Sequence, residues 1–326
     1  MDWSKGWEAR YYASFIDKES WRDIERFEIT GGKISRSAGE LIESADIEAV
    51  RYTRGEQWIR VFMDVRQNDT TEHIPVFTGL ATSPRDSIDG GLVTNSLECY
   101  SVLKPCQDIL LPRGWYTQSR IKYVLQDLLK YTPAPFHIAE NIPNLKKYIV
   151  AEQNETSLSM IYKILLAINW RMRIAGDGQI YIEPYPTEVS AEFSADYDVL
   201  EPQLEKDYDW YECPNVFRAI TEEDAVTVRD ESESELSVTS RGREIWAEDD
   251  GCALNEGETL YEYAVRRLKD EQTVGKSISY TRRFNPNVSV GDRITINYPQ
   301  AQGTYIVLSQ NIELGYDGKT SEEAVR

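Results

Sequence analysis

Apolar and polar residues alternate over most of the first hundred positions, which is the pattern of β-strands that bury one face. Turn residues separate the segments at roughly ten-residue spacing, so we predict about six strands in a barrel or a sandwich. Gly31 and Gly32 predict a turn or a bulge, and a turn at 53–56 predicts that its flanking segments pair. The predicted strands are residues 8–16, 21–29, 33–37, 47–52, 58–65, 74–81 and 92–103.

Helical spacing replaces this alternation after residue 114. A first helix is predicted to begin at a Ser119 cap and to end before Pro133 and Pro135, because proline lacks the amide donor and clashes with the preceding turn. A second helix is predicted to begin near Thr156. The predicted buried faces are Ile121, Val124, Leu125, Leu128 and Leu129 in the first helix, and Leu158, Ile161, Tyr162, Leu165 and Ile168 in the second.

A β-hairpin over residues 170–183 is predicted directly after the second helix, with Gly176, Asp177 and Gly178 as its tight turn. Asp177 in this turn does not predict a calcium site, because the remaining ligands of an EF-hand loop are absent from the sequence. Pro184 and Pro186 close this middle unit.

Strand patterning resumes near Glu192, and the last predicted strand ends at Leu314. Thr259 and Glu262 form a predicted capping box at the start of a third helix, since each side chain can satisfy a free backbone donor of the first turn. The acidic, serine-rich segment 229–235 is predicted to be a solvated loop. The strands predicted here are residues 216–220, 225–228, 236–239, 276–284, 293–298 and 304–314.

Two β units around a helical middle predict a mainly β fold with an α/β insert. For a chain of 326 residues we expect three domains. The predicted domains are a first β-barrel at 1–117, an α/β insert at 118–190 and a second β-barrel at 191–326, with one helix near 259–271.

The charge balance argues against recognition of nucleic acid, and the lack of long apolar runs argues against insertion into a membrane. The formal net charge is −19, whereas a nucleic-acid binder needs positive potential to neutralise phosphates. Basic pairs such as Lys146 with Lys147 and Arg282 with Arg283 are short. No apolar run reaches the roughly 18–20 residues that cross a bilayer, and the first residues do not show the pattern of a secretory signal. We therefore expect folding in a cytoplasm and no membrane insertion.

No metal, cofactor or catalytic residue is predicted. The cysteines at positions 99, 106, 213 and 252 form no Cys-x-x-Cys pair, so they are predicted to be reduced core residues. His73 and His137 are predicted to lie in loops or on the surface. The sequence contains no phosphate-binding glycine loop, no nucleophile elbow and no zinc-protease motif.

Two alternatives to a structural role stay open at this level. A cell-wall glycoside hydrolase needs only two converging carboxylates, and Asp196 with Asp198 or Glu201 with Glu205 are candidates. Surface charge explains such pairs in a chain with 55 acidic residues. A carbohydrate-binding module is suggested by 20 tyrosines and 8 tryptophans, although most lie at positions where core packing explains them.

Three stretches together resemble the baseplate hub proteins of long-tailed bacteriophages and phage-tail-like particles. The segment ETSLSMIYKILLAINWRMRIAGDGQIYIEPYP resembles the centre of that family. The segments FEITGGKISRSAGELIESADIEA and SISYTRRFNPNVSVGDRITINYPQAQGTYIVLSQNIEL are similar to its first and second barrels. The match lies in the order and patterning of elements over most of the chain.

The resemblance implies two tail-tube-like β-barrels flanking a small α+β domain, and a homotrimer whose six barrels form a ring. Such a ring would adapt a sixfold tail tube to a threefold tip or spike and line the DNA channel. The implied partners are tail tube or distal tail protein rings, a central spike or tip protein, the tape measure protein, and genomic DNA as passing cargo. The implied location is the baseplate of a virion tail, assembled in the cytoplasm of a bacterial host. No catalytic residue carries over.

Overall fold

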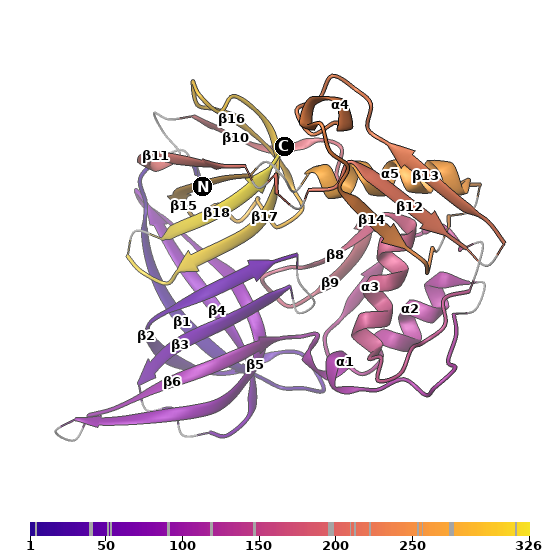
Figure 1. The fold of residues 1–326 in the computed structure, drawn as a ribbon. Coiled ribbons are helices and arrows are strands. Elements are labelled where there is room, and N and C mark those ends of the chain that lie inside the picture. The colour runs from indigo at the N-terminus through magenta and orange to yellow at the C-terminus, as the bar shows by residue number, and fades with distance from the viewer. Residues whose placement is uncertain are drawn as a thin grey trace.

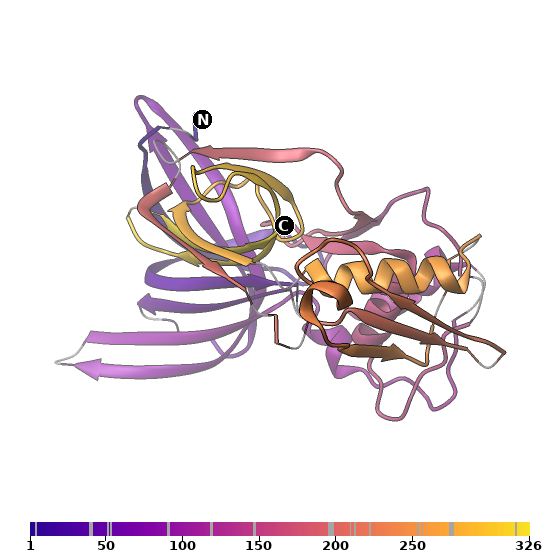
Figure 2. The same ribbon diagram turned by 45° about the horizontal axis from the view of Figure 1, so that its top comes forward.

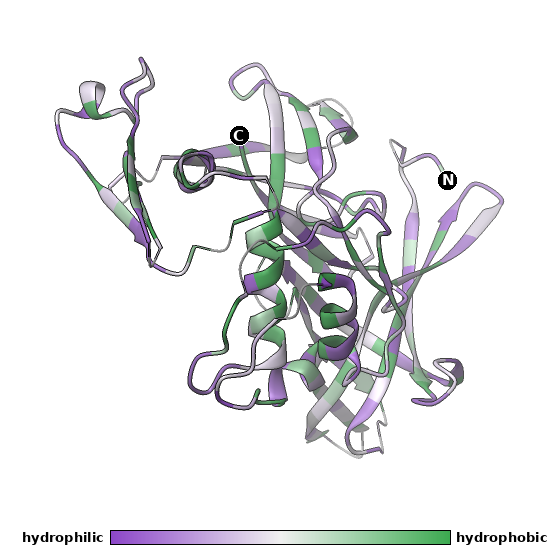
Figure 3. Cartoon of the chain, turned by 90° about the vertical axis from the view of Figure 1, so that its right-hand side faces the viewer, coloured by the Kyte–Doolittle hydropathy of each residue, from purple (hydrophilic) through white to green (hydrophobic). Residues whose placement is uncertain are grey.

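A computed structural model shows a mainly β protein, as predicted, with 49% strand and 15% helix (Figure 1). The structure describes the chain except at residues 4, 39–41, 51, 53, 90, 91, 118, 119, 146, 147, 195–198, 209, 212, 222, 253, 256, 274–276 and 317. Along most strands hydrophilic and hydrophobic residues alternate, and the central helices are hydrophobic over much of their length (Figure 3).

The N-terminal β unit consists of six antiparallel strands around one apolar core. Its pairing order is β1-β4-β5-β6-β3-β2, and β2 pairs with β1 as well, so the pairings return to the first strand. Ile47, Ile59 and Phe77 are fully buried inside it. The strands are β1 (Glu8–Ile16), β2 (Asp23–Ser37), β3 (Glu43–Val50), β4 (Gln57–Gln67), β5 (Thr70–Asp89) and β6 (Leu92–Ser101).

Two predictions for this unit need correction or refinement. The strands on either side of the turn at 53–56 do not pair with each other: β3 pairs with β2 and β6, whereas β4 pairs with β1 and β5. Alternation decides which face of a strand is buried but not which strand lies beside it. The segments 21–29 and 33–37 are one strand, β2, with the predicted bulge between Ile29 and Gly31.

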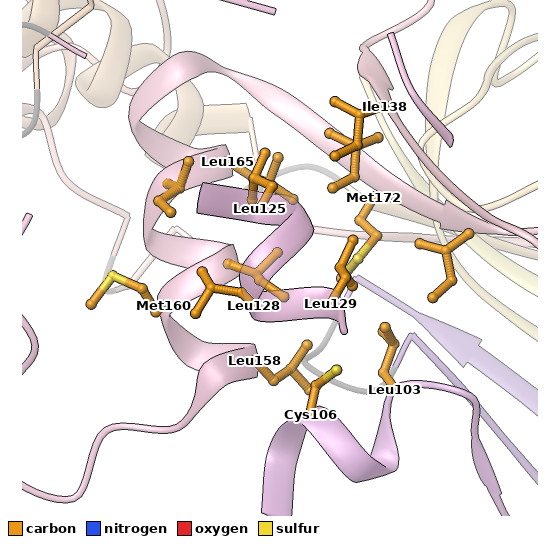
Figure 4. Packing of buried hydrophobic residues seen from close by; sticks show 14 of the residues in the cluster. Leu103, Cys106, Leu125, Leu128, Leu129, Ile138, Leu158, Met160, Leu165 and Met172 are labelled. Atoms are coloured by element: carbon orange, nitrogen blue, oxygen red, sulfur yellow. The ribbon is translucent and has the colours of Figure 1, made fainter. Parts of the chain in front are cut away.

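The helical middle has its own core, and the predicted buried face of its first helix is confirmed. In the second helix Leu158, Ile161, Leu165 and Ile168 are buried, while Tyr162 is half-buried. Figure 4 shows side chains from its helices and from β8 gathered in one cluster. The elements are α1 (Lys104–Asp108), α2 (Ile121–Leu129), β7 (Phe136–Ile138), α3 (Ser157–Ile168), β8 (Trp170–Ile174) and β9 (Ile180–Pro184).

The starts of α2 and α3, the two longer helices of this middle unit, depend on the residues next to them in the sequence. Thr156 caps α3 as predicted, because its side chain accepts a hydrogen bond from the backbone N–H of Ser159, whose hydroxyl in turn accepts one from the N–H of Thr156. Ser119 lies outside the described residues, and the N-cap position of α2 is Arg120.

The predicted hairpin β8–β9 contacts both β units. At its turn, the Thr78 hydroxyl donates to the carbonyl oxygen of Gly176 at 2.7 Å, and Arg60 donates to that of Asp177 at 3.0 Å. At its base, Arg171 donates to the Asp292 carboxylate at 2.7 Å in the C-terminal β unit. The hairpin therefore connects the two units.

The C-terminal β unit continues the first sheet rather than starting a separate one. Its pairing order is β10-β16-β17-β18-β15-β11, and Ile312 of β17 lies opposite Ile34 of β2 in an antiparallel pair. The strand β18 was not predicted from the sequence. The strands are β10 (Val189–Ser194), β11 (Val199–Asp207), β15 (Ser277–Arg283), β16 (Arg293–Asn297), β17 (Gly303–Glu313) and β18 (Lys319–Val325).

Between β11 and β15 the chain forms a small separate layer, in which α5 covers the sheet β13-β12-β14 (Figure 2). The capping box of Thr259 and Glu262 is confirmed at the start of α5. The predicted strand at 236–239 is wrong, because Ser237 accepts a hydrogen bond from the N–H of Ser240 and starts a short helix. The elements are β12 (Val216–Ile220), β13 (Ala225–Arg229), α4 (Val238–Arg241), β14 (Trp246–Asp249) and α5 (Leu260–Thr273).

Candidate functional site

The most extensive surface feature of the described chain is one face of a continuous antiparallel sheet. Eight strands lie side by side in the order β5-β6-β3-β2-β17-β18-β15-β11, and each neighbouring pair is antiparallel. Successive side chains of a strand point to opposite faces. One face of this sheet covers the apolar cores of the two β units, and the other carries polar residues.

We call this second surface the polar sheet face. One row of cross-strand partners shows its character: from β15 to β6 it runs through short hydroxyl and amide side chains and ends at a tyrosine. Ser35 donates to Asn311 within this row at 2.9 Å. The row consists of Thr281, Ser321, Asn311, Ser35, Ser44 and Tyr100.

Acidic residues are frequent on the polar sheet face. An open groove of about 400 Å³ over β11, β15, β18 and β17 is lined mainly by polar side chains, together with Tyr280. Lys33 lies opposite Glu313 and Asp46, which balances part of the charge. A mainly polar surface that is rich in carboxylates repels a polyanion. Its carboxylates include Asp46, Glu48, Glu98, Glu205, Asp207, Glu313 and Glu323.

A buried ionic cluster stabilises the strands behind the groove. The Arg282 guanidinium donates to both oxygens of the Glu322 carboxylate, at 2.8 and 2.5 Å, and both side chains are fully buried. Tyr280 donates to the same carboxylate at 2.6 Å, and Gln310 does so at 2.6 Å. These contacts join β15, β17 and β18, so they fix the register of the strands that carry the groove.

The electrostatics of this cluster follow from its burial. Burial raises the pKa of the Tyr280 hydroxyl well above its usual value, and the Glu322 charge raises it further. For Arg282, burial is the largest effect and opposes the charged form, but Glu322 and Tyr280 together outweigh it and raise the pKa of the guanidinium. No sequence pattern indicated this cluster, because Glu322 occupies a core position of an unpredicted strand.

A second buried carboxyl lies in the N-terminal unit. Arg36 donates to Glu43 at 3.2 Å, and the Glu43 side chain is fully buried. Burial raises the pKa of Glu43 to about 7, although the Arg36 charge works in the opposite direction.

The residues considered as catalytic or metal-binding candidates are dispersed. His73 is exposed and bonded to Asp64 at 2.6 Å, while His137 is exposed beside the Tyr181 ring. All four cysteines are buried, as predicted, and none of them is part of a disulfide. Asp177 accepts a hydrogen bond from the N–H of Gln179, which is the turn role predicted for it.

The carboxylate pairs considered for glycoside hydrolysis are not brought together as a described site. Asp196 and Asp198 lie outside the described residues, as do Lys146, Lys147 and the side chain of Glu201. Glu205 lies on the polar sheet face. Among the described residues no group of three or more His, Cys, Asp and Glu could hold a metal ion. No helix of the described part is long and apolar enough to span a membrane.

Comparison with solved structures finds tail proteins over nearly the whole chain. A tail protein from Neisseria meningitidis MC58 matches with a TM-score of 0.71 at 15% identity, covering 97% of both chains. The 43 kDa tail protein of prophage MuSo2 from Shewanella oneidensis matches with a TM-score of 0.69 at 13% identity, covering 98% of both chains. A Francisella PdpA–VgrG complex matches with a TM-score of 0.57 at 8% identity, covering all of this chain and 53% of that one.

These matches show that the chain has the fold of prophage tail proteins, which confirms the resemblance suggested by its sequence. No protein-family model and no curated protein matches the sequence.

Proposed function

We propose that this protein is the baseplate hub of a phage or prophage tail, a homotrimeric ring whose channel is lined by the polar sheet face. The observation that carries the proposal is the β2–β17 pairing, which merges two β units into one sheet with a single polar face. A sheet that is apolar on one face and hydrated on the other suits the wall of an aqueous channel. The shared fold with prophage tail proteins supports a structural role in a tail.

The proposal includes two tail-tube-like β-barrels. The N-terminal barrel is supported by the closed circuit of pairings from β1 back to β2. The C-terminal barrel is supported by six further strands around their own core. We propose domain boundaries at 1–117, 118–190 and 191–326, with the α5 layer as an insertion in the third domain.

Three copies with two β units each would place six similar units around one axis. Such a ring fits a sixfold tail tube or a distal tail protein ring on one side and a threefold spike or tip on the other. The fold match to a chain of a PdpA–VgrG complex is consistent with a subunit that works in a larger assembly, and we propose a central spike or tip protein as its partner. The tape measure protein and passing DNA would occupy the channel, and the protein would reside in the virion tail after assembly in the host cytoplasm.

We propose that the chain has no catalytic activity. The glycoside hydrolase and carbohydrate-binding alternatives are not proposed, because the candidate groups that the structure describes are dispersed. The acidic surface has a different use in a channel, where it keeps a polyanion from adhering.

Charge reversal on the polar sheet face tests this function. A triple variant replaces three exposed acids of that face by lysine: Asp46→Lys, Glu48→Lys and Glu98→Lys. The expected result is particles of normal composition that transfer DNA more slowly, because phosphates bind to the lysines in the channel.

A matched control reverses the same number of exposed charges away from that face, with Glu223→Lys, Glu231→Lys and Glu233→Lys. The control particles are expected to transfer DNA at the wild-type rate. Equal transfer rates in both triple variants would contradict the channel assignment.

A further inference from the structure

Two segments of the insert differ in charge from the rest of this acidic chain. Residues 109–126 and 141–151 contain five basic residues and no acidic one, although the whole chain has a net charge of −19. The acids that border these segments in the sequence do not cancel this charge, because each is already paired with a lysine. The pairs are Asp108 with Lys104, Asp127 with Lys130, Glu140 with Lys122 and Glu152 with Lys163.

Parts of these two segments lie side by side as an irregular antiparallel ribbon. The N–H of Thr117 donates to the carbonyl oxygen of Ile149 at 3.0 Å, and the N–H of Ala151 donates to that of Trp115 at 2.7 Å. Trp115 and Ile149 pack against the core of the insert, and Thr117 and Ala151 are buried. We call residues 109–117 together with residues 148–156 the tyrosine ribbon.

The other side of the tyrosine ribbon carries large side chains that the described chain does not cover. Tyr116 lies opposite Val150, and both are exposed, as are Tyr148 and Leu110. The rings of Tyr116 and Tyr148 meet edge to face, with their centroids 5.6 Å apart. Single exposed apolar residues are normal, but neighbouring ones on a surface indicate an interaction site.

Arginines accompany the exposed tyrosines. Arg113 lies in the turn before Trp115, and Arg120 occupies the N-cap position of α2 with its guanidinium 6.0 Å from the ring centre of Tyr123. Both arginines are exposed, and neither forms an ion pair within the part of the chain that the structure describes. Tyrosine and arginine are enriched in protein interfaces and among the residues that contribute most to their affinity.

We infer that the tyrosine ribbon binds an acidic segment of a different tail protein, whose carboxylates pair with Arg113 and Arg120 and whose apolar side chains contact Tyr116 and Tyr148. The charge of the ribbon requires an acidic partner. The choice of a different protein rests on the proposed function, because in the proposed ring the acidic polar sheet face of each copy lines the channel and is not available.

Substitution of one exposed tyrosine tests the docking surface. Tyr148→Ser removes a ring from the tyrosine ribbon, and Tyr261→Ser on α5 is the matched control, since the two side chains are 63% and 61% exposed. The melting temperature of the isolated protein is expected to stay unchanged in both variants. The expected result is at least a tenfold loss of assembled tail particles for Tyr148→Ser and wild-type assembly for Tyr261→Ser. Equal assembly of the two variants overturns the inference.

Zero-length cross-linking tests the chemistry of the partner. In intact particles a water-soluble carbodiimide joins an amine to a carboxylate in contact with it, forming an amide while the reagent takes up the water. Arg113→Lys supplies that amine on the ribbon, and Arg218→Lys supplies it on the exposed side of β12. The expected result, read by mass spectrometry, is a cross-link from position 113 to an Asp or Glu of another tail protein, and none to that protein from position 218.

Three outcomes overturn the inference while threefold rings in wild-type particles leave the hub function standing. The first is a cross-link from position 113 only to other copies of this chain, and the second is no cross-link at that position. The third is binding of the isolated protein to phosphatidylglycerol vesicles that Arg113→Glu abolishes, without a cross-link to protein in the particle. Absence of threefold rings in wild-type particles overturns the hub function itself.

Discussion

At the scale of single residues, the fold depends on buried charges that make their full set of contacts. Arg282 and Glu322 are fully buried, and Tyr280 and Gln310 add two donors to the carboxylate. A buried pair of this kind adds less stability than its Coulomb energy suggests, because both ions lose their hydration. Loss of one partner is costly, because the other stays buried with its charge uncompensated.

We therefore expect Glu322→Ala to lower the free energy of unfolding by about 3–5 kcal/mol. Glu323→Ala is the matched control, since Glu323 is the next residue on the same strand and points to the polar sheet face. The control is expected to stay within about 0.5 kcal/mol of wild type. Urea unfolding of the three proteins measures both values. Equal midpoints for both variants would show that the cluster does not stabilise these strands.

Burial of Glu43 makes the free energy of unfolding depend on pH, and it also sets the direction of that dependence. Its pKa is about 7 in the folded chain and near 4.5 when exposed. A carboxyl with a raised folded-state pKa contributes its full stability below its unfolded pKa, and this contribution is lost as pH rises through about 7. Each pH unit between the two pKa values lowers the free energy of unfolding by about 1.4 kcal/mol, so the total fall is about 3 kcal/mol by pH 8.

The expected result is a fall in stability between pH 4.5 and pH 8 that is smaller in Glu43→Gln than in wild type. Unfolding at both pH values measures this difference. Asp46→Asn is the control, because Asp46 lies on the same strand with an exposed side chain, and its variant is expected to keep the wild-type fall. A Glu43→Gln variant with an unchanged pH profile would contradict the assignment to Glu43.

At the scale of elements, the β8–β9 hairpin links the insert to both β units. Gly176 allows the turn of this hairpin to lie directly against β5 of the N-terminal unit. An added Cβ at Gly176 would lie 1.9 Å from the carbonyl oxygen of Pro75. Gly176→Ala must therefore push the turn outward and weaken the hydrogen bond from Thr78. The expected cost is about 1–3 kcal/mol of unfolding free energy.

Gly55→Ala is the control for this variant, because nothing lies within 4 Å of its added Cβ. Thermal and urea unfolding of both variants give the comparison. A Gly176→Ala protein as stable as the Gly55→Ala protein would mean that the hairpin is not held against the N-terminal unit.

Elements defined by local chemistry could be predicted from the sequence. The buried face of α2, the cap at Thr156 and the turn at Gly176 each depend on residues within one or two turns of chain. The strand β18 could not be predicted, because two of its buried positions, Thr320 and Glu322, are polar. The sequence therefore shows no alternation of apolar and polar residues there.

Partner choice could not be predicted, because it depends on residues far apart in the chain. The β2–β17 pair joins Ser35 to Asn311 across most of the sequence, and nothing local to either strand indicates the other. The same reason explains the wrong pairing of β3 with β4. The polar sheet face needs all eight strands in order, so no local pattern of residues could predict it.

At the scale of the whole molecule, the continuous sheet is the feature that links fold to function. Its single polar face suits the wall of an aqueous channel, and its edge strand β11 pairs only with β15 among the described strands. In the proposed ring, the net charge of −19 on each copy would oppose association, so the contacts between copies would have to outweigh that repulsion.

Electron cryomicroscopy of the intact tail particle shows directly whether this chain is a channel-lining hub. We predict that three copies form a threefold ring coaxial with the tail tube, with six β units around the bore and the polar sheet face toward the channel. A position off the tube axis, a ring of another symmetry, or a bore lined by the opposite faces of the sheets would contradict the hub assignment.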